Sequence, residues 1–271
     1  MSMEISSLLG LILGFVVVMV VMIMDGGSPA ELFAHPSAIL LTVGGAVVAS
    51  MVSSPLKIVL SIPALILRAI KGTKIDPLPV IETLTRMADK ARREGLLALE
   101  DEVKELDDPF LRKGLMMVVD GTDPALVRSV LEIEIENMHE RHAKGFGFFN
   151  SAGGYAPTMG IIGTVMGLIT VLKQLDEPSK LGKAIAGAFL ATLWGIMSAN
   201  IFWLPLGAKL ASLSEEEASF RRMLIEGILA IQSGENPRMV VEKLAAFLPP
   251  SQRTLDGAKP ERRDRAQEVG V

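Results

Sequence analysis

Threonine hydroxyls and prolines set in long uncharged stretches are the residues of this sequence most suited to chemistry. Pro157, Thr158 and Thr164 lie in one such stretch, and Thr192 lies in the next. A proline inside a helix leaves the carbonyl one turn back without its amide donor. A threonine hydroxyl can bond to its own helix, but Thr164 and Thr192 could also line a polar path between two helices. Simple helix packing is the alternative interpretation of both threonines.

These stretches contain no Asp, Glu, Lys, Arg or His side chain. Transport of protons or sodium through a membrane protein normally uses an ionisable group at depth. The chain by itself is therefore a poor ion carrier. Either it transports nothing, or a second polypeptide supplies the carboxylate.

A charged stretch at residues 89–102 is a second candidate, with the sequence DKARREGLLALEDE. As a solvated helix face it would hold ion pairs between residues four apart. As a docking surface it would use opposite charges to set register and association rate with a partner. The residues alone favour the solvated face, and the same holds for His139 and His142, whose spacing also permits a metal site.

Composition and motifs exclude other chemistry. The chain has no cysteine, so it holds neither disulfides nor thiolate metal sites. Its net charge of −4 argues against a general nucleic-acid binder. It has no phosphate-binding P-loop motif, and the glycines at 145 and 147 lack the third glycine of a dinucleotide turn. No Ser/His/Asp constellation is present either, so an enzyme has no support.

Four uncharged runs must position the prolines and threonines. Each is long enough to cross a hydrocarbon core of about 30 Å at about 1.5 Å per residue. They cover residues 5–24, 36–56, 146–172 and 184–208. The first is too long for a cleaved signal and is preceded by Glu4 rather than a basic cluster. Small residues four apart, at 163 and 167 and again from 187 to 199, predict close helix packing.

The basic residues orient these runs. Lys and Arg follow the second and fourth runs and precede the third, while the first short linker has none. The three lysines of the second short linker are the exception. By the positive-inside rule the block between the second and third runs, the tail and both termini are cytoplasmic.

We therefore expect an all-α membrane protein with four transmembrane helices, a large helical cytoplasmic loop between helices 2 and 3, and a cytoplasmic tail. The expected segments are 1–56 for transmembrane helices 1 and 2, 57–145 for the cytoplasmic helical loop, 146–208 for transmembrane helices 3 and 4, 209–248 for a helical tail and 249–271 for a disordered tail. Pro79 is expected to open a loop helix, and Gly121 to end one. Asp123-Pro124 and Asn236-Pro237 are expected to start two more, the second running to about Phe247.

Three stretches carry a family resemblance: residues 87–100, 156–167 and 226–238. Together with the four-run layout they resemble MotA/PomA, the ion-channel subunit of the bacterial flagellar stator, within the MotA/TolQ/ExbB group. The chain looks more like the PomA branch than the longer enteric MotA type. The resemblance extends from residue 5 to about residue 247.

This resemblance implies a mechanism. In the family, five copies of the subunit form a ring around two copies of a single-span, peptidoglycan-binding MotB/PomB-like partner in the bacterial inner membrane. The partner's aspartate carries the proton or sodium ion, and the turning ring pushes the rotor switch protein FliG. The expected function is thus conversion of ion motive force into torque, with the transported ion in place of any cofactor.

The resemblance also assigns rotor-facing residues. Arg92 and Glu100 match the family's rotor-facing charged pair, and Arg93 and Asp101 match neighbours that contribute in the PomA branch. Arg238 matches a charged position of the Asn-Pro-Arg turn. With the resemblance included, the charged stretch is interpreted as a docking surface.

In the membrane the resemblance assigns four residues. Pro157 and Pro205 match the prolines tied to torque, and Thr164 and Thr192 match the threonines that face the partner's aspartate. Gly154 is a departure, because sodium-type members often carry an aspartate there. This departure favours protons, whereas the threonines occur in proton-driven and sodium-driven members alike.

Two alternatives stay open from the sequence. An ExbB/TolQ-type energiser of outer-membrane transport belongs to the same group, but such proteins usually have three spans with one before the loop. A stand-alone transporter or structural scaffold is the third hypothesis. The uncharged spans argue against the transporter, and the charged loop argues against an inert scaffold.

Overall fold

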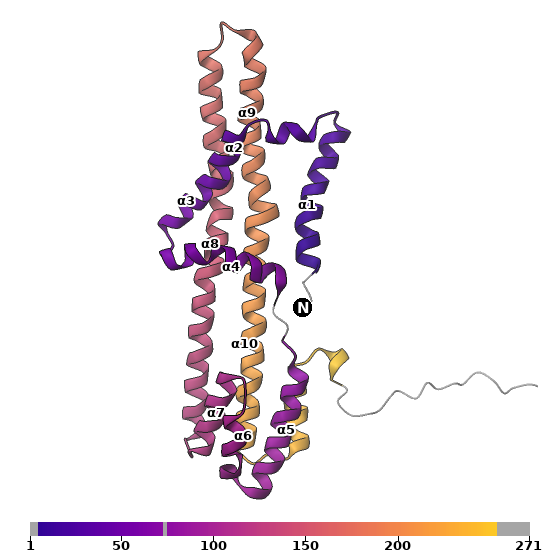
Figure 1. The fold of residues 1–271 in the computed structure, drawn as a ribbon, viewed down its shortest axis with the longest axis vertical. Coiled ribbons are helices and arrows are strands. Elements are labelled where there is room, and N and C mark those ends of the chain that lie inside the picture. The colour runs from indigo at the N-terminus through magenta and orange to yellow at the C-terminus, as the bar shows by residue number, and fades with distance from the viewer. Residues whose placement is uncertain (1–4, 73–74, 254–271) are drawn as a thin grey trace, which may run out of the picture. The chain divides into compact units, whose positions relative to one another are not determined.

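The computed structural model describes residues 5–72 and 75–253 (Figure 1). All regular secondary structure in this part of the chain is helical, as the sequence predicts. The chain divides into two units, the first made of Met1–Lys74 and Asn137–Glu216, the second of Ile75–Glu136 and Glu217–Val271. Two long helices, α8 (Pro124–Lys173) and α10 (Leu204–Gln232), contribute to both units.

The first unit holds the apolar helices. Its elements are α1 (Ile5–Met24), η1 (Pro29–Phe33), α2 (Pro36–Ile39), the π-helical η2 (Leu40–Gly44), α3 (Gly45–Val52), α4 (Leu56–Lys71), most of α8, α9 (Pro178–Met197), the π-helical η4 (Ser198–Trp203) and the start of α10. Figure 1 shows α8 side by side with α9 and the start of α10, with α4 lying across them.

Three helical stretches are long and apolar enough to cross a membrane: Ser6–Met24, Pro124–Lys173 and Lys180–Gln232. The third and fourth predicted runs lie within them, and the first run lies within Ser6–Met24 except for residue 5. The second run holds a shorter apolar helix, Pro36–Val52. It ends before the predicted residue 56 because Pro55 has no amide hydrogen and disfavours helical backbone at the preceding residue. Leu56 instead begins α4.

The core of the first unit lies between α8 and the α9–η4–α10 segment. Phe149 of α8 packs against Trp203, with ring centroids 6.2 Å apart. The buried cluster around this pair consists of Ala46, Ala69, Phe148, Phe149, Ala152, Ala156, Ala199, Trp203, Leu206 and Leu210. Pro205 explains the π-helical turn before it: without an amide hydrogen it cannot close the bond to the carbonyl of Ile201, so the helix widens locally.

The second unit is a small helical domain with its own core. Its elements are α5 (Pro77–Glu94), η3 (Leu96–Leu99), α6 (Glu100–Lys104), α7 (Pro109–Val119), the start of α8, the end of α10, α11 (Pro237–Ala245) and η5 (Pro250–Gln252). Its largest fully buried side chains are Ile81, Leu84, Met87, Leu99, Leu115, Leu131, Met223 and Leu224.

The predicted helix starts are confirmed where a side chain caps them. Asp123 Oδ1 accepts a hydrogen bond from the Ala125 amide at 2.9 Å, and Asn236 Oδ1 accepts one from the Arg238 amide at 3.0 Å. The prediction for α5 was two residues late, because Asp76 caps the helix and Pro77 is its first residue.

Two predicted ends also differ. α11 stops at Ala245, short of Phe247. Of the tail predicted to be disordered from residue 249, Pro250–Gln252 form a 3₁₀ turn, and Arg253 Nε donates to the Leu248 carbonyl at 2.8 Å. Residues 254–271 lie outside the described residues.

Candidate functional site

The Thr164 and Thr192 side chains meet between α8 and α9. Their hydroxyls hydrogen-bond to each other. Thr164 Oγ1 also lies 3.1 Å from the Gly160 carbonyl oxygen and 3.3 Å from that of Ala188. Thr192 Oγ1 lies 3.5 Å from the Gly160 carbonyl oxygen. Two hydroxyls and two carbonyls thus form a neutral, half-buried polar cluster that links the two helices.

Small residues make this close approach possible. A Cβ at Gly163 would lie 2.5 Å from Ala191 Cβ, and one at Gly167 would lie 2.5 Å from Ala188 Cβ. A Cβ at Gly195 would lie 2.6 Å from the Ala156 carbonyl oxygen. These distances are below van der Waals contact, so the glycines are packing residues, as their four-residue spacing predicts.

The two predicted prolines occupy different places. Pro157 lies inside α8, seven residues before Thr164 and so on nearly the same face of the helix. Thr158 bonds to its own helix, donating to the Tyr155 carbonyl at 2.8 Å, which is the local interpretation that the sequence allowed. Pro205 instead lines a cavity of about 370 Å³ between α1 and the η4–α10 segment.

Asn200 lines the same cavity as Pro205, together with Ser6, Ser7 and Lys209. The Asn200 side chain is exposed, and its amide donates to the Ile196 carbonyl at 2.8 Å. Our sequence interpretation passed over this amide, although an asparagine within an uncharged run was visible in the sequence. It adds a polar group to a helical stretch that is long and apolar enough to cross a membrane.

Gly154 has open space around it. No heavy atom lies within 4 Å of the position that its Cβ would take, and the residue is exposed. A longer side chain, such as the aspartate of sodium-type members, would therefore meet no steric obstacle within this chain. The glycine is not required by packing.

The charged stretch at 89–102 does not form the single helix face considered from the sequence. It forms the end of one helix, a short 3₁₀ turn and the start of the next helix. α5 ends at Glu94, Gly95 adopts a φ of +89°, and η3 and α6 follow. This positive φ is readily accessible only to glycine and reverses the chain. We call residues 92–101 the charged tip. Its centre is Leu97, whose side chain is 73% exposed.

The charges of the charged tip lie where the dipoles of α5 and α6 favour them, with basic residues at a C-terminus and acidic residues at an N-terminus. Arg92 and Arg93 lie in the last turn of α5, and Glu100 and Asp101 lie in the first turn of α6. Arg93 pairs with Asp89 at 2.8 Å. The exposed Arg92 has no ion-pair partner among the residues that the structure describes.

The acidic side of the charged tip is partly neutralised by Lys104. Its Nζ lies 2.8 Å from Glu100 Oε1 and 3.5 Å from Asp101 Oδ1. The hydrogen bond to Glu100 raises the pKa of Lys104, with a smaller contribution from the charge of Asp101. The Asp101 side chain is fully exposed. Arg92 and Asp101 are therefore both exposed to a partner.

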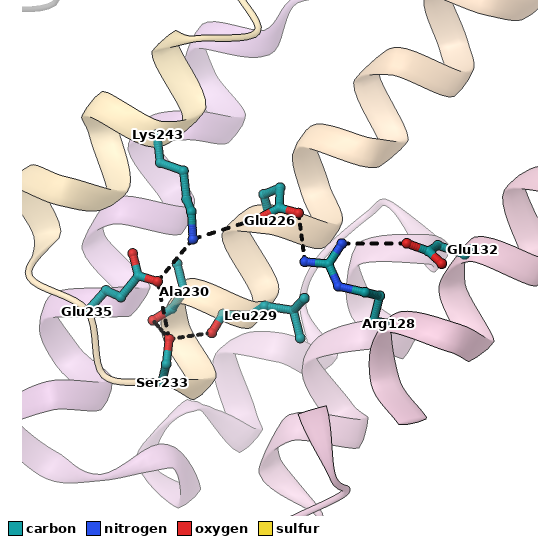
Figure 2. A network of polar contacts seen from close by, with 8 residues as sticks. All are labelled: Arg128, Glu132, Glu226, Leu229, Ala230, Ser233, Glu235 and Lys243. Carbon is teal, nitrogen blue, oxygen red and sulfur yellow. Dashed lines mark hydrogen bonds and ion pairs between the residues drawn. The ribbon is translucent and has the colours of Figure 1, made fainter. Parts of the chain in front are cut away.

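Arg238 lies exposed in the first turn of α11, which packs against α5. A polar network holds α11 in place, as Figure 2 shows. Glu226 of α10 lies 2.7 Å from Arg128 of α8 and 3.7 Å from Lys243 of α11, and Lys243 also bonds to Glu235 at 3.0 Å. The hydrogen bond that Arg128 donates to Glu226 raises the pKa of Arg128.

His139 and His142 do not form a merely solvated face. Their Nδ1 atoms lie 3.2 and 3.1 Å from the hydroxyl of the buried Ser214, on α10. A hydroxyl has one hydrogen and two lone pairs, so it can bond to both rings. Among residues 5–72 and 75–253, no cluster of three or more His, Cys, Asp or Glu side chains could hold a metal ion.

Comparisons with known proteins agree over nearly the whole chain. Residues 102–223 match the model of the MotA/TolQ/ExbB proton channel family, and residues 8–95 match that of the Motility protein A N-terminal region. Motility protein A of Bacillus subtilis is 39% identical over 93% of each chain. Chemotaxis protein PomA of Vibrio alginolyticus is 36% identical over 94% of this chain and 99% of its own length.

Two solved structures share the fold. The C. jejuni MotAB structure matches with a TM-score of 0.87 and 34% identity, covering 93% of this chain and 98% of its own. The flagellar MotAB stator complex from Bacillus subtilis matches with a TM-score of 0.84 and 38% identity, covering 91% and 96%.

Proposed function

This chain belongs to the MotA/TolQ/ExbB proton channel family, and on that basis we propose that it is a flagellar stator subunit that, with a MotB/PomB-like partner, converts ion motive force into torque. The observation that carries the proposal is the match over more than nine-tenths of the chain to proteins named Motility protein A and PomA and to MotAB structures. The ExbB/TolQ-type alternative is not favoured by these matches.

The threonine cluster supports a shared ion path. The apolar runs contain no Asp, Glu, Lys, Arg or His, and the Thr164–Thr192 cluster offers hydroxyls but no charge. A carboxylate from the partner would complete the path, and the hydroxyls would bond to it. Pro157, on nearly the same α8 face, belongs to this site, and Pro205 belongs to the segment whose helix widens at η4.

Four membrane spans are part of the proposal. The fourth is Pro36–Val52, whose 17 residues stand at the short end of the range for a spanning helix. With four spans, both termini and the charged block face the cytoplasm of a bacterium, as the basic residues favour. A ring of five copies around the partner in the inner membrane completes the assembly that the family implies.

The charged tip and Arg238 are proposed to contact FliG of the rotor. Arg92, Arg93, Glu100 and Asp101 are all exposed on one turn, and α11 brings Arg238 to the same unit. Exposed complementary charges set register and association rate with little binding energy per pair. Such contacts suit a surface that must engage and release repeatedly.

Complementation tests the proposed function. A motile strain deleted for its own stator genes should swim only when this chain and its partner are both supplied. Proteoliposomes should pass protons only when they contain both proteins. Ion flux through the chain alone would overturn the shared path, and lack of swimming with both proteins at normal assembly would overturn the stator role.

Variants then separate the sites. Arg92→Glu and Glu100→Arg should impair swimming without loss of membrane assembly, whereas Glu82→Arg, on α5 away from the charged tip, should not. Thr192→Leu should reduce ion flux, and Thr170→Leu is the control, since the Thr170 hydroxyl bonds only within its own helix. Unchanged swimming after reversal of both tip charges would return the charged tip to a solvated surface.

A further inference from the structure

α4 lies across the long helices of the first unit instead of beside them (Figure 1). It meets α8 at Gly145, where an added Cβ would lie 3.3 Å from Leu65 Cδ1. The uncharged run of α8 begins at the next residue, Phe146. If α8 crosses the bilayer, α4 therefore lies along the membrane surface, at the depth where the hydrocarbon core begins.

α4 has two apolar faces, and one of them is covered. Ala69 is fully buried, and Ile58, Ile62 and Leu65 pack against the core of the first unit. The opposite face carries leucines at spacings of four and seven residues, which places them on one side of the helix. Leu56, Leu60 and Leu67 are 67%, 73% and 50% exposed there. No described residue of this chain covers this face.

A row of cations borders the exposed leucines. Lys57, Arg68 and Lys71 are eleven and three residues apart, which places them within a narrow arc of the helix. All three are exposed, and the lysines have no acidic partner among the described residues. The sequence contains no Asp or Glu between residues 36 and 75. The two lysines therefore carry charge that no described acidic side chain neutralises.

We propose that this face of α4 binds anionic phospholipid, with the leucines in the acyl region and Lys57, Arg68 and Lys71 at the phosphate groups. A helix with an apolar strip beside basic residues is the pattern of interfacial membrane binding. A neutral lipid would cover the leucines but leave the two lysines without anions. The proposal depends on membrane insertion of the chain and is independent of its role in torque.

Lipid selectivity tests the proposal. The chain, purified with its partner, is placed in phosphatidylcholine vesicles that contain a trace of spin-labelled phosphatidylglycerol or spin-labelled phosphatidylcholine. Surface cations attract anionic lipid by up to about five-fold each. We expect a several-fold preference for phosphatidylglycerol that falls toward one in Lys57→Gln/Lys71→Gln. An equal preference in wild type and this double variant would overturn the proposal.

Lys173→Gln/Lys183→Gln is the matched control, because it removes the same charge near the linker between α8 and α9. It should retain the preference. If both double variants lose it equally, the effect is one of net charge and the assignment to α4 is wrong.

The absence of cysteine permits a second, positional test. Leu60→Cys is labelled with a fluorophore in vesicles that contain lipid with a nitroxide near the top of its acyl chain. We expect strong quenching, and little at Leu97→Cys, which is equally exposed but lies on the charged tip. Absence of quenching, or cross-linking of two copies through Leu60→Cys, would show that lipid does not cover the face. If this chain failed to restore swimming in the complementation experiment, both lipid measurements would still test the proposal, because neither depends on torque.

Discussion

Gly163→Ala is the sharpest test of the geometry around the threonine cluster. The added Cβ would lie 2.5 Å from Ala191 Cβ and 3.2 Å from Leu41 Cδ2. Carbon atoms pack at about 3.5–4.0 Å, so α8 and α9 must separate by about 1 Å. The Thr192–Gly160 contact, already at 3.5 Å, would then be lost, and the bond between the two threonine hydroxyls would stretch.

The expected cost follows from three effects. Overpacking costs about 1–3 kcal/mol, and loss of a hydrogen bond costs about 1 kcal/mol. Replacement of a helical glycine by alanine returns about 0.5–1 kcal/mol. Gly163→Ala should therefore destabilise the first unit by about 1–3 kcal/mol and also reduce ion flux.

Gly147→Ala is the matched control for this substitution. It lies on the same helix, and no atom is within 4 Å of the new Cβ, so it should leave stability unchanged or slightly raised. The thermal midpoint of the purified complex and swimming in the complemented strain are measured side by side. Adding Ala191→Gly to Gly163→Ala removes the closest contact and should recover part of the midpoint. Equal midpoints for Gly163→Ala and Gly147→Ala would refute the close-packing argument.

Three further predictions concern the second unit, each measured as the thermal midpoint of the purified chain. Glu226→Gln removes the carboxylate that Arg128 and Lys243 share and should lower the free energy of unfolding by about 1–2 kcal/mol. Glu132→Gln, at a side chain more than half exposed, should lower it by only a few tenths of a kcal/mol. Equal losses of stability in the two variants would contradict a central role for Glu226. Asp123→Ala removes the cap of α8 and should cost about 1 kcal/mol, whereas Asp123→Asn should retain most of it. Because the pKa of Lys104 is raised above 10.5, its bond to Glu100 stabilises fully below that pH and is lost only as pH rises through the folded pKa. The midpoint difference between wild type and Lys104→Gln should then stay constant from pH 7 to 9, and a narrowing in that range would contradict the assignment.

Features encoded by neighbouring residues were predictable from the sequence. Asp123-Pro124 and Asn236-Pro237 start helices because the cap, the proline and the orphan amides are adjacent in the chain. α1 coincides with the first uncharged run, since nothing within residues 5–24 interrupts it. The pairing of Thr164 with Thr192 could be expected from mid-depth positions in neighbouring helices, together with small residues that let the helices approach.

Features that depend on distant residues were not predictable in the same way. From the sequence His139 and His142 were interpreted as solvent-facing. The Ser214 hydroxyl to which both hydrogen-bond is more than 70 residues away along the chain. The residues of α4 after Leu56 were assigned from the sequence to the cytoplasmic loop 57–145. The apolar face by which α4 packs on the first unit becomes apparent only once the core of that unit is known. The turn at Gly95 was a different failure: a glycine between two charged runs signals a break, and our interpretation of a continuous helix face overlooked it.

In the proposed function, the threonine cluster would let a chain without Asp, Glu, Lys, Arg or His in its apolar runs respond to an ion carried by a partner. The Thr164 hydroxyl has three acceptors within 3.3 Å, two of them backbone carbonyls, and one hydrogen to share among them. Rotation of that hydrogen changes its partner without moving a helix. A carboxylate that approaches the cluster can take the hydrogen as acceptor, whereas a protonated carboxyl group can donate to the same oxygen. On the proposed function the hydroxyls would therefore serve both protonation states of the partner's carboxyl group, which a lysine or a second carboxylate at this depth could not do without burying a charge.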